Sequence, residues 1–527
     1  MVVVEPRPWR TARARLARAA GAVTPRLARA ARTAGPRLAR YARATAPRLT
    51  RITRPNTWQY TAGAATVGLA LAVGVVTAAG PWDSTGQRTA ERVRAVARNH
   101  TGGADHGRGT GAAGPPRPAP SAGTVLAGLG ATSGAAAAAP RGKALDEVLS
   151  PLLTDPALGA RHGASVVDLT TGGRLYGTGV GTSLVPASTT KIATAAAALT
   201  ALGPDHRLTT RAAFEADTGE LVLVGGGDPT LTARADAGGL ASLRTLAANS
   251  AKALRKRAVR KVTLSYDTTL YAGSGRHPIG VNDNLATVTA LMADEARTDG
   301  STSGPAARAA DPAADAARTF ADLLGEHGVK ATPPGPSKAT NRADTLATVS
   351  SPPLSSLVER MLTHSDNDLA EALARHTAAA SGKKADFRGA SAAVTARLKQ
   401  LGVSVRGADI HDGSGLDRAD RLTADLLTDL LTAAADPDRP ELRAALTGLP
   451  VAGFTGTLSG RYTDGAAGLV RAKTGTLTGV NTLAGTVVTR DGRALAFAFL
   501  ADGTTDPAAA QSALDRMATS LAECGCR

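Results

Sequence analysis

The sequence predicts an α+β fold in which the first and last parts of the folded region contribute to one sheet. Strand patterns occur near its start, at residues 163–179, and again near its end, at residues 468–501. Helical patterns and a further β-rich stretch lie between them, which is the arrangement expected when material is inserted into a sheet domain. At 527 residues the chain has room for about two to four folded units.

The first elements of the folded region are a helix over residues 144–153 and a hairpin over residues 163–179 that turns at Thr-Gly-Gly. A helix over residues 188–202 follows and runs into an Ala-rich segment. Residues 208–275 contain several β-like segments, among them LVLVGGG and VRKVTLSYD. We expect the inserted β-rich material to begin here.

The second half of the folded region is mainly helical before it returns to strands. Apolar residues recur at helical spacing in residues 312–328, 353–363, 368–380, 387–401 and 423–435. Strands are expected at 468–475, 481–490 and 493–501, the last two joined by a turn at Asp491 and Gly492. A helix at 507–523 follows, and the ending Cys524-Gly-Cys526 leaves open a local disulfide or two free thiols.

The net charge of +17 is concentrated at one end of the chain. Residues 1–54 hold 14 Arg, no Lys and one acid, Glu5, so they supply +13 and leave +4 for the rest. No folded module accompanies this basic tail, so we expect no nucleic-acid binding. Contact with the anionic inner leaflet and a merely solvated tail both remain open for its Arg-Leu-Ala-Arg-like units.

An uncharged stretch between Arg54 and Asp83 is long enough to cross about 30 Å of hydrocarbon as a helix. Arginines precede it, and by the positive-inside rule they stay in the cytoplasm. We therefore expect a basic cytoplasmic tail (1–56), a transmembrane anchor (57–82) and a flexible linker (83–142). The catalytic part would lie outside the membrane. A cleaved signal peptide is the alternative, which the long N-terminal flank disfavours.

The first motif with chemical content is Ser188-Thr-Thr-Lys191, at the start of the helix expected over residues 188–202. Positions i and i+3 share one face of a helix, so the Lys191 amine can reach the Ser188 hydroxyl. If burial or a nearby cation lowers the pKa of Lys191, its neutral amine can take the hydroxyl proton. The motif alone is weak, because a chain of this length contains it about once by chance.

The second motif is Ser365-Asp366-Asn367, between two expected helices. A hydroxyl and a carboxamide in such a turn can relay a proton and hold a substrate amide. All three residue types are also favoured helix N-caps, so capping alone explains the tripeptide when it is taken by itself.

The third motif is Lys473-Thr474-Gly475-Thr476, at the end of an expected strand. Its cation and hydroxyl can bind a carboxylate, and Gly475 allows a ligand backbone to lie close to the strand. The motifs follow one another at intervals of 177 residues (188 to 365) and 108 residues (365 to 473).

Together the three motifs resemble the set of the penicillin-binding proteins and serine β-lactamases. Other segments resemble the low-molecular-mass class C group, the D-alanyl-D-alanine carboxypeptidase/endopeptidase family: GGGDPTL (225–231), SDNDLAEAL (365–373), DGSGLDR (412–418), LPVAGFTGTL (449–458) and AKTGTLTGV (472–480). The likeness runs from about residue 143 to residue 521. The first interval leaves room for an inserted domain, which that family carries and β-lactamases lack.

The resemblance implies a penicillin-binding protein/serine β-lactamase-like transpeptidase fold, with an antiparallel sheet flanked by helices, an all-helical subdomain and one inserted β-rich domain. The catalytic domain would comprise residues 143–203 and 346–527, and the inserted domain residues 204–345. The implied function is that of a serine D-alanyl-D-alanine carboxypeptidase, an endopeptidase or both. It would act on peptidoglycan stem peptides and be inhibited covalently by β-lactams.

The resemblance also implies catalytic roles for five residues. Ser188 would be acylated and Lys191 would be its general base. Ser365 and Lys473 would pass the proton to the departing D-alanine. Asn367 would bind the amide of the acyl side chain.

Substrate-binding roles follow in the same way for the third motif. Thr474 and Thr476 would hold the terminal carboxylate beside Gly475. The backbone N–H groups of Ser188 and Thr476 would form the oxyanion hole, because such donors stabilise the charge of the transition state.

Two other functions stay open. A β-lactamase-like hydrolase would need a dedicated carboxylate base, which the sequence does not obviously offer. A catalytically silent, membrane-anchored wall-binding protein would not need intact motif residues. We expect no metal and no cofactor, and we treat His364, beside the second motif, as a bystander.

Overall fold

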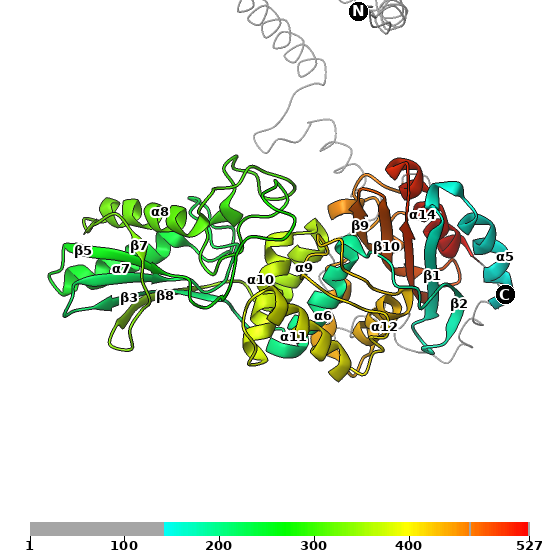
Figure 1. The fold of residues 1–527 in the computed structure, drawn as a ribbon, viewed down its shortest axis with the longest axis horizontal. Helices are drawn as coiled ribbons and strands as arrows, with labels where there is room; N and C mark the ends of the chain where they lie inside the picture. The colour runs from blue at the N-terminus through cyan, green and yellow to red at the C-terminus, as the bar shows by residue number, and fades with distance from the viewer. Residues whose placement is uncertain (1–141, 463–464, 525–527) are drawn as a thin grey trace, which may run out of the picture. The chain divides into compact units, whose positions relative to one another are not determined.

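The computed structural model describes residues 142–462 and 465–524 (Figure 1). The expected cytoplasmic tail, the membrane anchor and all of the linker up to residue 141 lie outside the described residues. Among the helices that the structure describes, none has the length and apolar character that crossing a membrane requires. Cys524 is disulfide-bonded, and the other cysteine of the chain, Cys526, lies outside the described residues.

The first sheet joins the two ends of the folded region. Its strand order is β2-β1-β11-β10-β9, and every neighbouring pair is antiparallel. The strands are β1 (Arg161–Asp168), β2 (Arg174–Thr178), β9 (Val470–Leu477), β10 (Val480–Val488) and β11 (Ala494–Asp502). Strand β1 pairs with β11 along its whole length, from Arg161 opposite Asp502 to Asp168 opposite Leu495.

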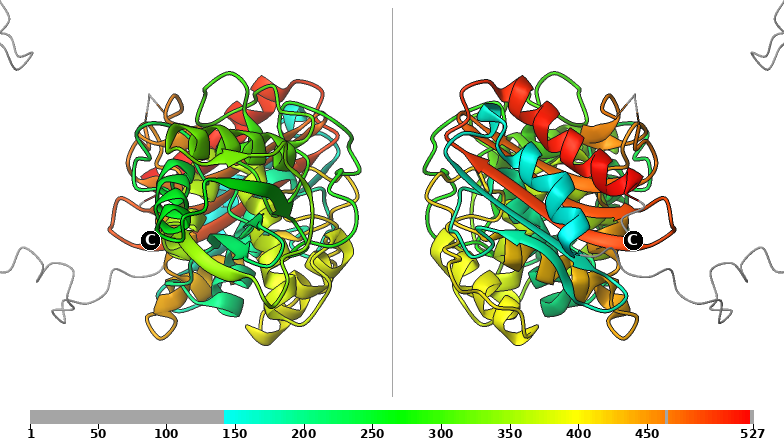
Figure 2. Two further views of the ribbon diagram at one scale, coloured as in Figure 1. Left: turned by 90° about the vertical axis from the view of Figure 1, so that its left-hand side faces the viewer. Right: turned by 90° about the vertical axis from the view of Figure 1, so that its right-hand side faces the viewer.

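Helices cover both faces of this sheet. On one face Phe497 and Phe499 pack in a core with α5 (Gly142–Leu153) and α14 (Pro507–Glu523), two helices that Figure 2 shows over the strands in cyan and red. On the other face Ala496 and Ala498 belong to a second core. Because side chains alternate along a strand, residues 496–499 of β11 present phenylalanines to one helical layer and alanines to the other.

An all-helical subdomain packs on the alanine face of the sheet. Its helices are α6 (Thr190–Leu202), α9 (Leu354–His364), α10 (Asn367–Ala380), α11 (Phe387–Gln400), α12 (Ala424–Ala435) and α13 (Ala444–Thr447). Helix α6 is buried on all sides from Thr190 to Leu199, as a helix without a polar face must be in a soluble domain. The first turn of α6 is therefore held firmly between the sheet and the other helices (Figure 1).

A second sheet is built from residues 209–350. Its strands are β3 (Thr209–Glu215), β4 (Glu220–Val224), β5 (Lys261–Asp267), β6 (Lys330–Ala331), β7 (Gly335–Pro336) and β8 (Asp344–Ser350). They lie in the order β6-β5-β4-β3-β8, and β7 also pairs with β5. Helices α7 (Leu243–Lys256) and α8 (Pro312–Glu326) share one core with this sheet. Short 3-10 helices complete the chain: η3 (Pro156–Leu158), η4 (Ala187–Thr189), η5 (Asp294–Ala296), η6 (Pro440–Leu442) and η7 (Gly456–Leu458).

Helix α7 lies in the stretch for which only β segments were expected. Ser242 caps it by accepting the Thr245 N–H, and Leu243, Leu246 and Leu254 are buried along one face. The strands on either side, β4 and β5, are neighbours that run parallel. A parallel pair needs a crossover connection, usually a helix, and α7 supplies it.

Candidate active site

Ser188 lies in the 3-10 helix η4, which leads directly into α6. Its side chain is partly exposed, whereas Lys191, one turn later, is completely buried. Lys191 Nζ donates a hydrogen bond of 3.0 Å to Ser188 Oγ. The spacing of three residues thus places an amine and a hydroxyl in direct contact at the start of a buried helix.

Two further oxygens bind the amine of Lys191. Nζ donates to Asn367 Oδ1 at 2.6 Å and to the backbone carbonyl of Ser414 at 2.7 Å. Burial lowers the pKa of Lys191 to about 8, although neighbouring carboxyl groups oppose the shift. A neutral amine is therefore accessible close to physiological pH.

Ser365 and Asn367 flank the junction of α9 and α10. Ser365 ends α9 in the left-handed conformation, with a φ of 57°. Asp366 caps α10 by accepting the Leu369 N–H at 3.0 Å. The capping role therefore falls to Asp366, which leaves the side chains on either side of it free to serve the pocket.

Lys473 lies on β9 and is also completely buried. Its Nζ donates to Ser365 Oγ at 2.8 Å and to the Thr474 carbonyl at 2.9 Å. Burial, reinforced by the charge of Lys191, holds the pKa of Lys473 well below its usual range. Two amines from separate elements thus share one desolvated region, where a charge on one disfavours a charge on the other.

Gly475 allows β9 to lie directly against the turn that carries the nucleophile. A Cβ at this position would lie 2.1 Å from Thr482 Oγ1 and 2.7 Å from the Pro186 carbonyl. Thr482 Oγ1 also donates to the Pro186 carbonyl at 2.8 Å. Any side chain at Gly475 would therefore push η4 and the strand apart.

β9 is the last strand of the sheet, and some of its backbone groups point away from β10, out of the sheet. The Ala472 N–H donates to the Pro450 carbonyl at 3.0 Å, and the Thr474 carbonyl accepts from Lys473 Nζ. Backbone groups alternate in direction along a strand, so those of Thr476 leave β9 at the same edge. The side chains of Thr474 and Thr476 line the pocket beside this edge.

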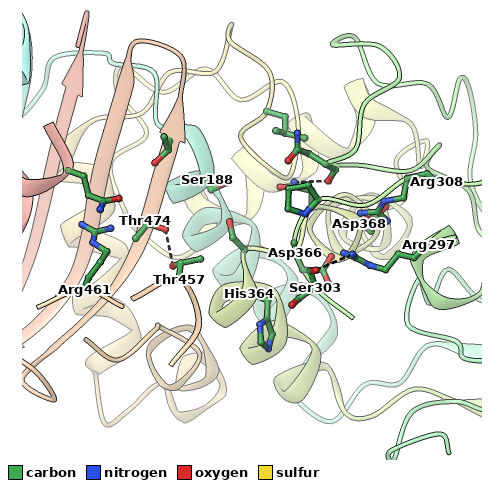
Figure 3. A pocket seen from close by; sticks show the side chains of 18 residues that line it. Ser188, Arg297, Ser303, Arg308, His364, Asp366, Asp368, Thr457, Arg461 and Thr474 are labelled. Atoms are coloured by element: carbon green, nitrogen blue, oxygen red, sulfur yellow. Dashed lines mark hydrogen bonds and ion pairs between the residues drawn. The ribbon is translucent and has the colours of Figure 1, made fainter. Parts of the chain in front are cut away.

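The motif side chains meet at one pocket of about 400 Å³ (Figure 3). In Figure 3 Thr457, Thr474 and Arg461 lie on one side of Ser188, and Arg308 lies on the other. Thr474 Oγ1 donates to Thr457 Oγ1 at 2.9 Å. Five of the residues with expected roles line the pocket wall: Ser188, Ser365, Asn367, Thr474 and Thr476. The two lysines lie behind this wall and reach it through the serine hydroxyls that they contact.

The pocket also contains residues to which no motif pointed. Three regions supply them: the β5–α8 loop (Asn284, Arg297, Ser303 and Arg308), the segment before β9 (Thr457 and Arg461) and α14 (Gln511). The Asn284 carbonyl accepts from Asn367 Nδ2 at 2.8 Å. The segment that builds the second sheet (residues 209–350), which we call the inserted segment, therefore orients the amide whose oxygen binds Lys191. Of these residues, Thr457 had a signal in the sequence outside the three motifs, because it belongs to the LPVAGFTGTL segment. His364, expected to be a bystander, also forms part of the pocket wall.

Arginines of the β5–α8 loop and of α9 bind the acids next to the pocket. Arg308 Nη1 lies 2.8 Å from Asp368 Oδ2, and Glu295 pairs with Arg297 at 2.7 Å and with Arg360 at 2.6 Å. Among the described residues, two groups of three are close enough together to hold a metal ion: Glu295, Asp366 and Asp368, and His277, Glu371 and Asp412. Arginine and N–H donors already bind oxygens in both groups, which is the chemistry of an ion-pair network.

Comparisons with known proteins identify the family to which the chain is similar. A model of the D-Ala-D-Ala carboxypeptidase 3 (S13) family matches residues 145–306 and 282–524. Carboxypeptidase DacB of Mycolicibacterium smegmatis is 35% identical over 497 residues, which cover 90% of this chain and 99% of that protein. The D-alanyl-D-alanine carboxypeptidase of Actinomadura sp. is 31% identical over 468 residues, which cover 72% of this chain and 84% of that protein.

A solved structure shares the fold. Penicillin binding protein 4 (dacB) from Haemophilus influenzae superimposes with a TM-score of 0.59 at 21% sequence identity, covering 72% of this chain and 98% of that one. The α+β arrangement of an antiparallel sheet with helices, expected from the sequence, is confirmed by this match.

The Asp368–Arg308 pair should stabilise the contact between the inserted segment and α10. Asp368→Ala leaves the buried Arg308, whose side chain is 5% exposed, without its counter-charge, and should lower the free energy of unfolding by about 3 kcal/mol. Asp315→Ala is the control, because its pair with Arg318 is more than half exposed and should contribute less than about 0.5 kcal/mol. Urea unfolding measures both, and equal stability of the two variants would contradict a structural role for the buried pair.

Proposed function

The chain belongs to the D-Ala-D-Ala carboxypeptidase 3 (S13) family, and from that premise we propose that Ser188 is its acylated nucleophile and Lys191 the general base. The enzyme is a serine D-alanyl-D-alanine carboxypeptidase. The observation that carries the assignment is the 3.0 Å contact between Ser188 Oγ and the desolvated amine of Lys191, at the wall of the pocket.

Acylation begins when Ser188 Oγ attacks the carbonyl carbon of the penultimate D-alanine and Lys191 Nζ takes the hydroxyl proton. The C–N bond to the terminal D-alanine then breaks, which leaves an ester on Ser188. We assign the protonation of the departing amine to Ser365 and Lys473, which are 2.8 Å apart. Water finally attacks the ester, restores the hydroxyl and releases the shortened stem peptide.

Substrate positioning falls to groups around the nucleophile. The N–H groups of Ser188 and Thr476 would bind the oxyanion, and each such donor stabilises the transition state by about 3 kcal/mol. Asn367 would bind the amide of the acyl group. The hydroxyls of Thr474 and Thr476, with Gly475 between them and the charge of Lys473 behind, would bind the terminal carboxylate.

Slow hydrolysis of penicillin is favoured over β-lactamase activity. Among the described residues that line the pocket, the carboxyl groups are those of Asp366 and Asp368. Asp366 caps α10 and Asp368 is paired with Arg308. Neither is free to activate a water molecule, so an acyl-enzyme formed with a β-lactam should persist.

The location of the enzyme follows from its N-terminal sequence. We propose that residues 1–56 are cytoplasmic, that residues 57–82 anchor the chain and that residues 83–142 link the anchor to the enzyme. The uncharged stretch after Arg54 and its arginine-rich flank support this. The catalytic domain (143–203 and 346–527) and the inserted domain (204–345) would then meet peptidoglycan outside the membrane.

Ser188→Ala should abolish covalent labelling by a fluorescent penicillin, because the variant lacks the attacking oxygen. Ser183→Ala is the control: it removes a hydroxyl five residues away that donates to the Gly407 carbonyl and should leave labelling intact. Labelled protein is quantified after denaturing electrophoresis. Stoichiometric labelling of Ser188→Ala would show that another residue is the nucleophile.

The acylation rate should rise with pH through about 8, the pKa of Lys191. Below this pKa the amine is protonated and cannot accept the hydroxyl proton, so the rate should fall about tenfold for each unit of pH. Stopped-flow labelling across the neutral and alkaline range measures the profile. A rate independent of pH around 8 would contradict Lys191 as the base.

Product analysis tests the substrate. Purified stem pentapeptides should release free D-alanine, because the hydroxyls of Thr474 and Thr476 suit a terminal carboxylate. Cross-linked dimers provide a parallel assay, in which conversion to monomers would reveal endopeptidase activity in addition. Cleavage of dimers without release of D-alanine from pentapeptides would contradict the carboxypeptidase assignment.

A further inference from the structure

His277 is a buried side chain that the β5–α8 loop contributes to the catalytic domain. Its Nε2 lies 2.9 Å from Asp412 Oδ2, and the two side chains are only 2% and 1% exposed. The ring of Phe387 packs edge-on against the imidazole, with ring centroids 5.2 Å apart. This contact is buried and directional, and the mechanism above does not use it.

Asp412 organises the turn formed by residues 412–417. Its Oδ1 accepts the N–H groups of Ser414 at 3.1 Å and Gly415 at 2.6 Å, and its Oδ2 accepts that of Asp417 at 2.8 Å. Although burial opposes it, side-chain and backbone hydrogen bonds lower the pKa of Asp412 to about 2. The turn is therefore built around an ionised carboxylate.

The 412–417 turn holds the proposed base. The Ser414 carbonyl accepts from Lys191 Nζ at 2.7 Å, and the Gly413 carbonyl accepts from Thr194 Oγ1, one turn along the same helix, at 2.6 Å. A shift of this turn would move an oxygen that positions the amine against the nucleophile.

Asp412 is also the persistent negative charge close to Lys191. Among the described residues, the groups that act on Lys191 come from α10 and its cap, from residues 412–420 and from β9: Asp366, Glu371, Asp412, Asp420 and Lys473. Burial raises the pKa of Glu371 to about 7 and that of Asp420 to about 10. It also raises the pKa of Asp366 well above its usual range. Asp412 therefore remains ionised where the other carboxyl groups tend to be protonated.

The hydrogen bond from His277 to Asp412 is the same in both protonation states of the ring. The Ile279 N–H points at Nδ1 from 3.2 Å, which suits the neutral ring with its proton on Nε2. Against the effect of burial, the carboxyl groups of Asp412, Glu371 and Asp417 raise the pKa of His277, which favours the imidazolium. In either form Nε2–H donates to Asp412.

We infer that His277 is a positioning residue of the reaction: through Asp412 and the 412–417 turn, the inserted segment fixes the carbonyl that holds Lys191 and offsets the negative charge beside it. This rests on the proposed role of Lys191 as the base. The inserted segment then acts on the chemistry of the enzyme as well as on the shape of its pocket.

The test measures the rate at which a fluorescent penicillin acylates the full chain as a function of pH. It compares the wild-type chain with two variants at position 277. His277→Leu removes the N–H donor and leaves the Asp412 charge to favour the ammonium form of Lys191. The pH at which the acylation rate rises should therefore be about one unit higher than in the wild type. At neutral pH the rate should be about tenfold lower. His277→Gln keeps an N–H near the position of Nε2 and should restore the wild-type rate to within about threefold.

His376→Leu is the matched control. His376 is likewise a buried histidine between α10 and the inserted segment, where it contacts the Gly227 carbonyl, His206 and Tyr271. Its loss should lower the melting temperature and leave the pH dependence of acylation unchanged. A displaced curve in this variant would show a general effect of packing and would overturn the inference.

A wild-type curve for His277→Leu would overturn the inference as well. If His277→Leu does not fold, Asp412→Asn replaces it, because removal of the negative charge should move the rise of the rate to lower pH. An unmoved curve in Asp412→Asn would then overturn the inference. A wild-type chain that penicillin does not acylate at all would instead contradict the proposed function.

Discussion

The site depends on two ammonium groups that are buried among hydroxyl, amide and carbonyl oxygens. Lys191 and Lys473 are bound by such neutral groups, so burial is not fully compensated and the pKa of each falls. The surrounding architecture maintains this condition. Helix α6 is buried on all sides, and Gly475 lets β9 close against η4. A water-filled version of the same site would keep Lys191 protonated, and a protonated Lys191 could not act as the proposed base.

The inserted segment contributes to this electrostatic balance. Helix α10 begins with Asn367, a ligand of Lys191, yet carries acids in the same turn and the next. Arg308 binds Asp368, and His277 binds Asp412. Both partners come from the β5–α8 loop, so Asp368 and Asp412 are engaged by a part of the chain that lies outside the three motifs.

The sequence allowed the main elements and the motif residues to be predicted, because both follow from short-range patterns. Helical spacing put Lys191 next to Ser188, and the turn at Asp491 and Gly492 helped to locate the last two strands. Contributions from distant segments could not be read in this way. Nothing in the spacing of His277 relates it to Asp412, 135 positions later. The glycine run at 225–227 is another case: Gly227 has a φ of 72°, whereas Gly226 is required by close packing, since a Cβ there would lie 2.1 Å from the Thr209 carbonyl.

The pairing of β1 with β11 sets the order in which the enzyme can become active. Residues at the two ends of the folded region, such as Arg161 and Asp502, must meet before the central sheet is complete. Ser188, the proposed nucleophile, is synthesised early, whereas Lys473 on β9 follows 285 residues later (188 to 473). A nascent chain therefore cannot assemble the complete proposed site until nearly all of it has emerged. A product truncated before β9 would lack Lys473 and the three strands that complete the sheet.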